Sequence, residues 1–366
     1  VLDSAKATEI QSEDLSMYAD ETGNVRVSIV LEKPSTIEKV NYKTENLIEN
    51  ASAMTYRRSL EQDQAVLTAA ASNALGHELH VVWNLTLAAN LISATVQPEE
   101  VETLRSLPGV AQVVPEVRYE PCVVDSNVAE PLMGSSGPMI GSDLAWNAGY
   151  TGAGQRTAII DTGLATDHQS VNAAAFEYAL QQTGKDLETL HLLDKEELAK
   201  IIPELNIYKG YADSEGKVIA DQTLTADKLY VSSKIPFGYN YIDRNLDVTH
   251  KNDKQGGHGS HVAGIAAANR YIQQRGRFVE ASEVVHMQGV APDAQLLVMK
   301  VFGSAGGAYE SDYAVAIEDA ILLGCDSVNL SLGSAAVGFT SSAWKSIFDH
   351  LAQCDAVVTF AAGNSG

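Results

Sequence analysis

Apolar and polar side chains alternate over residues 25–31, which is the period of a half-buried strand. Residues 45–75 are then rich in alanine and charge, contain no proline or glycine, and are followed by Gly76. Such a stretch predicts a long helix that stops at a glycine. Shorter patterns follow, and they predict strands at residues 80–87, 91–96 and 110–114 and a helix at residues 98–107.

These elements come in the order strand, helix, strand, strand, helix, strand, which predicts a small α+β domain with the ferredoxin-like, split βαβ topology. Residues 21–119 form this predicted domain. Residues 1–20 are polar and without pattern, so we expect a disordered leader there. Residues 120–142 are rich in proline, glycine, serine and asparagine, which favours a linker and a domain boundary.

Residues 143–366 have a different pattern, in which short apolar strands alternate with helical stretches. Apolar, β-branched strands separated by helices are typical of a parallel sheet covered on both faces, so we predict an α/β domain. Residues 166–248 are a large insertion, with a helix predicted at residues 186–201. The remaining strands are predicted at residues 157–160, 296–301, 327–330 and 356–360, and the helices at residues 261–275, 311–323 and 342–353.

Composition narrows the range of partners. The chain has 366 residues, which fits two domains, and a formal net charge of −22, which would repel polyphosphate and anionic lipid. We therefore expect no nucleic-acid partner. Residues 79–98 lack Asp, Glu, Lys and Arg, but their frequent polar side chains favour two strands over a membrane span.

The cysteines and the start of the chain bear on the compartment. The chain has 3 cysteines, at no paired or metal-ligand spacing, so neither a disulfide framework nor a zinc site is indicated. It begins at Val1, without a basic and then apolar start, which suits an exported chain whose signal has been removed.

Candidate chemistry begins where the apolar strand at residues 157–160 ends in Asp161-Thr162-Gly163. This places a carboxylate at the carboxyl edge of a parallel sheet, where open α/β folds locate their sites. Asp-Thr-Gly is equally typical of an aspartic protease and of an ordinary turn after a strand, so the motif alone leaves these alternatives open.

Two further motifs follow in the chain. His258 lies between two glycines and opens a helix of small residues that also carries His261. Two histidines at this spacing suggest a metal site, but no third ligand stands at a suitable spacing, so we predict no metal there. Asn364 follows the last predicted strand in a turn, where asparagine usually serves the backbone conformation.

The three motifs in this order resemble the subtilisin-like serine proteases, or subtilases. Asp161 matches the family's aspartate, His258 its histidine, with Ser260 where the family motif has threonine, and Asn364 its oxyanion-hole asparagine. The resemblance implies peptide-bond hydrolysis by an Asp-His-Ser triad, in which His258 moves the proton and Asp161 orients the imidazole. Asn364 would donate to the oxyanion.

The resemblance also implies a substrate cleft for polypeptides. Two segments would pair with an extended peptide through their main chains. The cleft residues implied in this way are Gly306, Gly307, Ala308, Ser331, Leu332 and Gly333.

Residues 104–115 read Leu-x-x-x-Pro-Gly-Val-x-x-Val-x-Pro and resemble the end of the inhibitory propeptides of this family. The first domain is therefore expected to be a prodomain that inhibits its own protease, with autocleavage between Cys122 and Pro131. The insertion and the segment 237–241 are most similar to the lactocepin-type cell-envelope proteinases of Gram-positive bacteria. This implies a secreted or cell-envelope protein whose chemistry needs no cofactor, with structural calcium left open.

The family's serine lies in a Gly-Thr-Ser-Met-Ala motif, which does not occur in this sequence. The resemblance thus implies a subtilisin-like catalytic domain that is incomplete at its C-terminus, inactive alone and dependent on the C-terminal remainder of the protease. A non-catalytic binding module of the same fold is the alternative. An aspartic protease is a weaker one, because the chain has no second Asp-Thr/Ser-Gly for that reaction.

Overall fold

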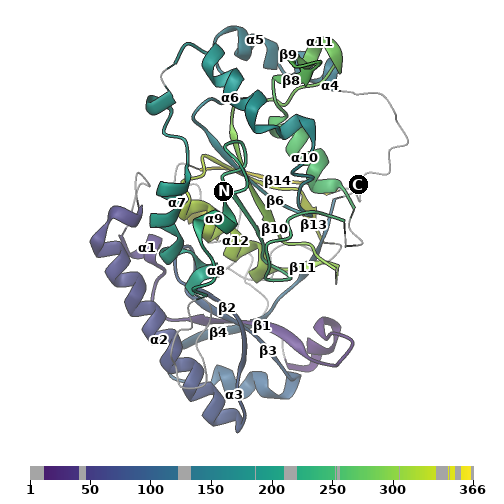
Figure 1. Cartoon of the computed structure of the whole chain (residues 1–366). Coiled ribbons are helices and arrows are strands. Elements are labelled where there is room, and N and C mark those ends of the chain that lie inside the picture. Colours follow the sequence, from purple (N-terminus) through teal and green to yellow (C-terminus); the bar gives the residue numbers. More distant parts are fainter. Residues whose placement is uncertain are drawn as a thin grey trace, which may run out of the picture.

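The structure is a computed structural model of the chain. It describes residues 12–40, 47–122, 133–185, 187–209, 221–251, 253, 256–304, 306–334, 345, 347–350 and 356–363. These residues form two units that pack against each other (Figure 1), which we call the N-terminal unit (residues 12–122) and the C-terminal unit (residues 133–363).

The N-terminal unit is a four-stranded antiparallel sheet in the order β2-β3-β1-β4. Its long helix and a short one pack on one face around a core that includes Ile29, Leu67 and Leu104. This strand order is that of a split βαβ unit. The elements are β1 (Val25–Leu31), α1 (Thr36–Val40), α2 (Ala51–Leu75), β2 (His80–Leu85), β3 (Leu91–Val96), α3 (Val101–Arg105) and β4 (Val110–Pro115).

Helix α2 begins later than residue 45, where the sequence pattern placed its start. The side chain of Asn50 accepts hydrogen bonds from the N–H groups of Ser52 and Ala53, each at 3.1 Å, and so caps the helix. The predicted stop is confirmed, because Gly76 adopts φ 79° directly after the last turn.

Of two other sequence expectations for this unit, the structure confirms one and corrects the other. The strands predicted within residues 79–98 are confirmed as β2 and β3, and no helix among the described residues is long and apolar enough to cross a membrane. The expected disordered leader over residues 1–20 is replaced in its described part by a 3₁₀ helix, Ser12–Tyr18. Its Leu15 is buried in the core of the unit, which explains the order.

The C-terminal unit contains a five-stranded parallel sheet in the order β14-β12-β6-β10-β7, which confirms the predicted α/β class. Helix α10 covers one face, where Ala263 packs near Ile159, and α12 covers the other face. The strands are β6 (Arg156–Asp161), β7 (Phe237–Asn240), β10 (Gln295–Lys300), β12 (Ser327–Leu330) and β14 (Val357–Phe360), and the covering helices are α10 (His258–Ala267) and α12 (Glu310–Leu322).

The insertion wraps around one side of this sheet and supplies its edge strand β7. The helix predicted at residues 186–201 is shorter, because Asp194 accepts the N–H of Glu197 and starts the helix at Lys195. The helices of the insertion are α6 (Ala173–Gln182), α7 (Lys195–Ile201), α8 (Asn206–Lys209) and α9 (Ala226–Leu229), with 3₁₀ turns at Gln169–Val171, Leu187–Leu190 and Ile202–Glu204.

The helix predicted at residues 261–275 is wrong beyond Ala267. A two-stranded hairpin follows instead, formed by β8 (Tyr271–Gln274) and β9 (Arg277–Glu280). Its two turn residues, Arg275 and Gly276, have φ of 51° and 77°, and a turn with two positive φ values matches the twist of a hairpin. Of the helix predicted at residues 342–353, only 345 and 347–350 are described, and they are helical.

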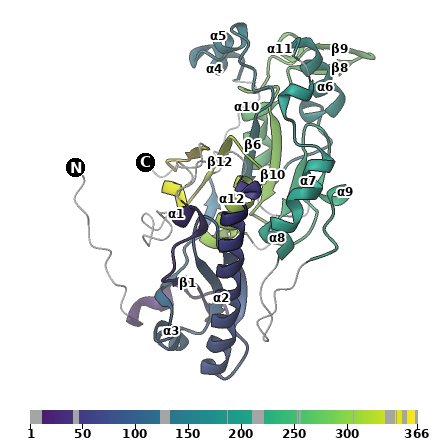
Figure 2. The ribbon, with the colours of Figure 1, turned by 90° about the vertical axis from the view of Figure 1, so that its left-hand side faces the viewer.

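The two units are joined by a strand that spans the predicted boundary between the first domain (residues 21–119) and the linker (residues 120–142). Strand β5 (Arg118–Pro121) lies between β11 (Ala308–Tyr309) and β13 (Leu332–Gly333) and pairs antiparallel with both. The other face of the N-terminal sheet packs on α12, as Figure 2 shows from the side. The short helices α4 (Met133–Met139), α5 (Ser142–Asn147) and α11 (Ala281–Val284) lie at the far end of the C-terminal unit (Figure 1).

Candidate active site

A buried carboxylate and an imidazole meet at the carboxyl edge of the central strand. Asp161 is the last residue of β6, and His258 is the first residue of α10. The Nδ1 atom of His258 lies 2.8 Å from Oδ1 of Asp161. The structure therefore brings together two of the three residues that the sequence motifs singled out, although they are 97 positions apart.

The residues next to this pair hold the two segments together. The hydroxyl of Thr162 accepts the N–H of Gly259 at 2.9 Å and donates to the carbonyl of Gly256 at 3.2 Å. At Gly259 a Cβ atom would lie 2.3 Å from the carbonyl oxygen of Gly163, so a side chain would push the start of α10 away from β6. Glycine at this position lets His258 reach Asp161.

Ser260 also fixes this junction. Its Oγ accepts the N–H of Ala165 at 2.8 Å. Serine at this position therefore retains the hydroxyl of the family's threonine, and this hydroxyl has a structural partner.

Lys300 is a buried cation beside the pair that the sequence motifs did not identify. It is the last residue of β10 and pairs in register with Asp161. Its Nζ donates to the carbonyls of Thr162 at 2.8 Å and Thr249 at 3.0 Å and forms an ion pair with Asp253. The only signal in the sequence was a lysine at the end of an otherwise apolar strand. Its contacts fix the loop that follows Asp161.

The pKa of His258 is raised above its ordinary value. The hydrogen bond to Asp161 is the largest cause, and partial burial opposes it by disfavouring the charged ring. The carboxylate charge and the carbonyl of Cys122 raise the pKa further.

That carbonyl belongs to the strand that joins the two units. The oxygen of Cys122 lies 3.1 Å from Nε2 of His258, and the N–H of Cys122 donates to the carbonyl of Ser331 at 3.0 Å. Upstream, Tyr119 pairs with Ala308 on one side, and Pro121 pairs with Leu332 on the other. A main-chain segment thus runs between two strands and ends at the imidazole.

Five of the six cleft residues named from the sequence touch this segment. Ala308, Ser331, Leu332 and Gly333 pair with it or bond to it, and a Cβ at Gly307 would lie 2.5 Å from the carbonyl oxygen of Tyr119. Gly306 instead forms a bridge with Gly303 at the turn before β11.

The side chain of Tyr119 is buried in the C-terminal unit. Its ring meets that of Tyr313 edge to face, with 5.3 Å between the ring centroids. Burial is the main reason that the pKa of Tyr119 rises to about 12, so its hydroxyl stays neutral. Tyr119 therefore anchors the segment through an aromatic contact.

The remaining predicted site residue, Asn364, lies outside the described residues, four positions after the end of β14 at Phe360. Among the residues that the structure does describe, no group of three or more His, Cys, Asp or Glu side chains could hold a metal ion.

The parallel sheet, with α10 on one face and α12 on the other, thus places Asp161 and His258 together at its carboxyl edge. Residues 152–366 match the model of the Subtilase family, and this match covers more than half of the chain. The chain therefore belongs to the subtilase family.

Curated relatives are similar over most of the chain but are much longer. The minor extracellular protease Vpr of Bacillus subtilis (strain 168) is 25% identical over 258 residues, which are 69% of this chain and 23% of Vpr. The PII-type proteinase of Lactococcus lactis subsp. cremoris is 30% identical over 250 residues, 67% of this chain and 10% of the proteinase. The C5a peptidase of Streptococcus pyogenes serotype M3 (strain ATCC BAA-595 / MGAS315) is 28% identical over 216 residues, 58% of this chain and 15% of the peptidase.

Proposed function

We propose that this chain is the prodomain and the first part of the catalytic domain of a secreted or cell-envelope serine endopeptidase. The observation that carries the proposal is the position of His258, whose imidazole lies between the carboxylate of Asp161 and the main-chain carbonyl of Cys122. A serine protease needs an acid that orients the imidazole in this way, and the carbonyl shows that a main chain can reach the proton-carrying nitrogen.

In the proposed reaction, Nε2 of His258 takes the proton from a serine hydroxyl and later gives it to the leaving amine. Asp161 accepts from Nδ1–H, which selects the tautomer and stabilises the imidazolium. Asn364 donates to the oxyanion of the tetrahedral intermediate. The serine is supplied by the C-terminal remainder of the protease, so this chain alone does not hydrolyse peptides, and no cofactor takes part.

The N-terminal unit acts as the intramolecular inhibitor. Strand β5 fills the cleft by adding to β11 and β13, which is how an extended polypeptide substrate would bind. Because the carbonyl of Cys122 is the one beside His258, we place autocleavage at the bond between Cys122 and Val123. This site is the first bond of the stretch Cys122 to Pro131 in which the sequence placed cleavage.

The test uses the chain joined to its encoded C-terminal continuation. A fluorophosphonate probe is expected to label the serine, and the released fragment should begin at Val123 by mass spectrometry. Substitution His258→Ala should reduce the rate of labelling by roughly 1000-fold or more.

Substitution His261→Ala is the matched control, because His261 lies on the same helix one turn later and is exposed. It should leave labelling unchanged. A folded protein that the probe does not label would contradict the proposal and favour a non-catalytic binding module.

A further inference from the structure

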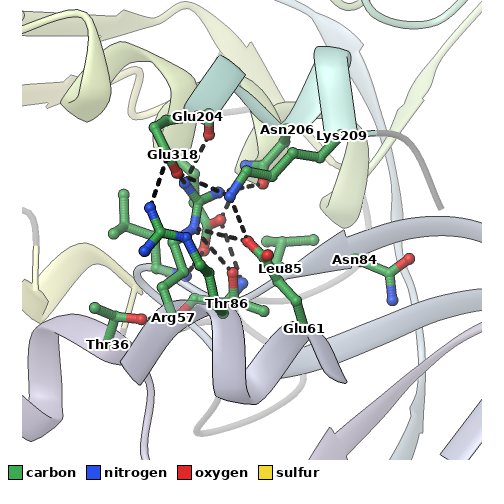
Figure 3. A network of polar contacts seen from close by, with 12 residues as sticks. Thr36, Arg57, Glu61, Asn84, Leu85, Thr86, Glu204, Asn206, Lys209 and Glu318 are labelled. Carbon is green, nitrogen blue, oxygen red and sulfur yellow. Dashed lines mark hydrogen bonds and ion pairs between the residues drawn. The ribbon is translucent and has the colours of Figure 1, made fainter. Parts of the chain in front are cut away.

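The insertion contacts the N-terminal unit at a place away from the cleft. The 3₁₀ turn Ile202–Glu204 and helix α8 (Asn206–Lys209) lie against α2 of the N-terminal unit, as Figure 3 shows. In both Figure 1 and Figure 2, α8 lies near α2. We call the residues of the insertion that make this contact, Glu204, Asn206 and Lys209, the insertion platform.

The centre of the contact is the guanidinium of Arg57 on α2, which is fully buried. It donates to the carbonyl of Glu204 at 2.6 Å and to Oδ1 of Asn206 at 2.8 Å. Its third hydrogen bond, at 3.1 Å, goes to the hydroxyl of Thr86 in its own unit. Two of these three acceptors therefore come from the insertion, and a buried charge that loses its partners is strongly destabilised.

Asn206 connects Arg57 to α12. While its Oδ1 accepts from Arg57, its Nδ2 donates to Glu318 at 3.0 Å, and its backbone N–H donates to Asp319 at 2.7 Å. An amide suits this place, because it provides an acceptor for the cation and a donor for the carboxylate from the same side chain.

Glu318 extends the contact to a loop of the N-terminal unit. One of its oxygens accepts the N–H groups of Leu87, Ala88 and Ala89 at 2.9, 2.8 and 3.3 Å. Burial raises the pKa of Glu318, and the charge of Arg57, the side chain of Asn206 and the N–H groups of Ala88 and Ala89 act in the opposite direction. The carboxylate thus has a full set of donors only while the N-terminal unit is docked.

A ring of ion pairs surrounds this centre. Lys209 donates to Glu61 on α2 at 2.6 Å and to Glu204 at 2.9 Å. Arg58 reaches Glu204 at 3.4 Å, but its side chain is 60% exposed. The half-exposed pair of Arg58 with Glu204 contributes little to the stability of docking compared with the buried guanidinium of Arg57.

A second part of the insertion also touches the N-terminal unit. The guanidinium of Arg244 lies over the ring of Trp83, 4.3 Å from its centroid, and donates to the carbonyl of Val82. Contacts of the insertion therefore reach both α2 and β2.

We propose that the insertion platform is a dedicated recognition site for the prodomain of this protease, which holds the prodomain after the bond at the cleft is cut. The partner that fits this site presents a guanidinium able to be buried, and beside it a loop with consecutive N–H groups that the neighbouring Glu318 of α12 accepts. The N-terminal unit of this chain has both. This inference rests on the proposed function, in which that unit is released after autocleavage.

The test measures how fast the N-terminal unit leaves. The full chain is folded with a recognition sequence for an added protease between residues 123 and 132, cut there, and immobilised through the C-terminal unit. Substitution Arg57→Ala is expected to speed dissociation roughly 100-fold, because removing one partner of a buried charged contact acts mainly on the dissociation rate. Arg58→Ala on the same helix is the matched control and should change the rate less than about 3-fold.

A second pair of variants guards against misfolding of the N-terminal unit. Asn206→Ala changes only the insertion side and should speed dissociation as well. Arg57→Lys keeps the charge, so its dissociation rate should fall between those of Arg57→Ala and the unsubstituted chain. If Arg57→Ala and Asn206→Ala combined act no more strongly than either alone, the two residues work as one contact. Rates within about 3-fold of the unsubstituted chain for both alanine variants, with unchanged circular dichroism, would overturn the proposal.

Dissociation is measured without hydrolysis, so this result is independent of whether the longer protein is an active protease. Loss of fluorophosphonate labelling would remove the proposed function, whereas an inert Arg57 would remove only the insertion platform.

Discussion

At the scale of single residues, the protonation of His258 follows from its two neighbours. A carboxylate oxygen of Asp161 and a carbonyl oxygen of Cys122 both accept hydrogen bonds, so both ring nitrogens must donate. This geometry suits the charged ring, which is the form that the raised pKa of His258 favours. In the proposed reaction, Nε2 could not accept a proton from a serine while it donates to this carbonyl, so the strand would inhibit the chemistry as well as occupy the cleft.

The first residue-scale prediction concerns this titration. A raised pKa means that the contribution of His258 to stability is complete below the ordinary value of 6.5 and is lost as the pH rises through the raised value. Substitution Asp161→Asn should lower the pKa of His258, because it removes the largest cause of the shift. An NMR titration of the ring measures this.

Glu100→Gln is the control, because Glu100 bonds the exposed ring of His77. It should lower the pKa of His77 and leave that of His258 unchanged. Equal titration of His258 in the Asp161→Asn variant and the unsubstituted chain would contradict the assignment.

At the scale of elements, α12 carries two consecutive buried carboxylates at the junction of the units. Burial raises the pKa of Asp319 to about 7, although the N–H of Asn206 and the hydroxyl of Tyr241 favour its charged form. Burial also raises the pKa of Glu318. Ionisation of these two buried carboxyl groups near neutral pH therefore lowers the free energy of unfolding.

The prediction for this element is a pH dependence of unfolding. Because the pKa of Asp319 is about 7 in the folded chain and the ordinary value is 3.8, the free energy of unfolding should fall as the pH rises between these values. Asp319→Asn should remove part of this fall, on the order of a few kcal/mol. Thermal unfolding between pH 4 and pH 8 measures it.

Asp63→Asn provides the comparison, because Asp63 forms an exposed pair with Lys33. Its unfolding should keep the pH dependence of the unsubstituted chain. A fall that persists unchanged in Asp319→Asn would assign the effect to other groups.

How far the elements could be predicted depends on how local their causes are. The strands of the antiparallel sheet and four of the five strands of the parallel sheet followed from apolar runs and alternation, and Gly76 stopped α2 as expected, but the edge strand β7 was not predicted. The start of α2 was missed because Asn50 acts as a cap only when its side chain turns back on the helix. The hairpin after Ala267 was missed because positive φ at Arg275 is not visible in residue type.

The residues of the candidate site, too, could be predicted only where a local motif marked them. Asp161 and His258 were found through motifs whose family resemblance implied that they meet. Lys300, Arg57 and Asn206 were not found, because each acquires its meaning from partners far away in the chain. A buried lysine or arginine looks like any other surface cation until the fold supplies its acceptors.

At the scale of the whole molecule, the N-terminal unit is attached at several places, which include the strand in the cleft, the acidic helix α12, the insertion platform and Arg244. On α12, Glu310 accepts the N–H of Val117 at 2.9 Å, and Asp312 accepts from Trp83 at 2.8 Å. Several buried contacts on separate elements make docking depend on the orientation of the whole unit.

The prediction at this scale distinguishes the contact of strand β5 in the cleft from the other contacts that dock the N-terminal unit. Tyr119→Ala should release the strand while the unit stays docked, because a buried aromatic anchor is worth about 3 kcal/mol or more. The amide hydrogen of Cys122 should then exchange roughly 100-fold faster, since it bonds to Ser331 only while the strand is in place.

Arg118→Ala, at a half-exposed neighbouring position, should leave this exchange rate nearly unchanged. If the amide of Cys122 exchanges at the same rate in both variants, Tyr119 is no anchor.

The strand β5 also defines what could replace it. It is the middle member of three strands, so β11 and β13 stand about 10 Å apart, twice the spacing of paired strands, and cannot bond to each other when it leaves. The vacancy is one strand wide and open only to a single stretched backbone. Under the proposed function, compact proteins would therefore resist cleavage until a local segment unfolds, and the rate at which a protein is cleaved would depend on the ease of that local unfolding more than on its sequence.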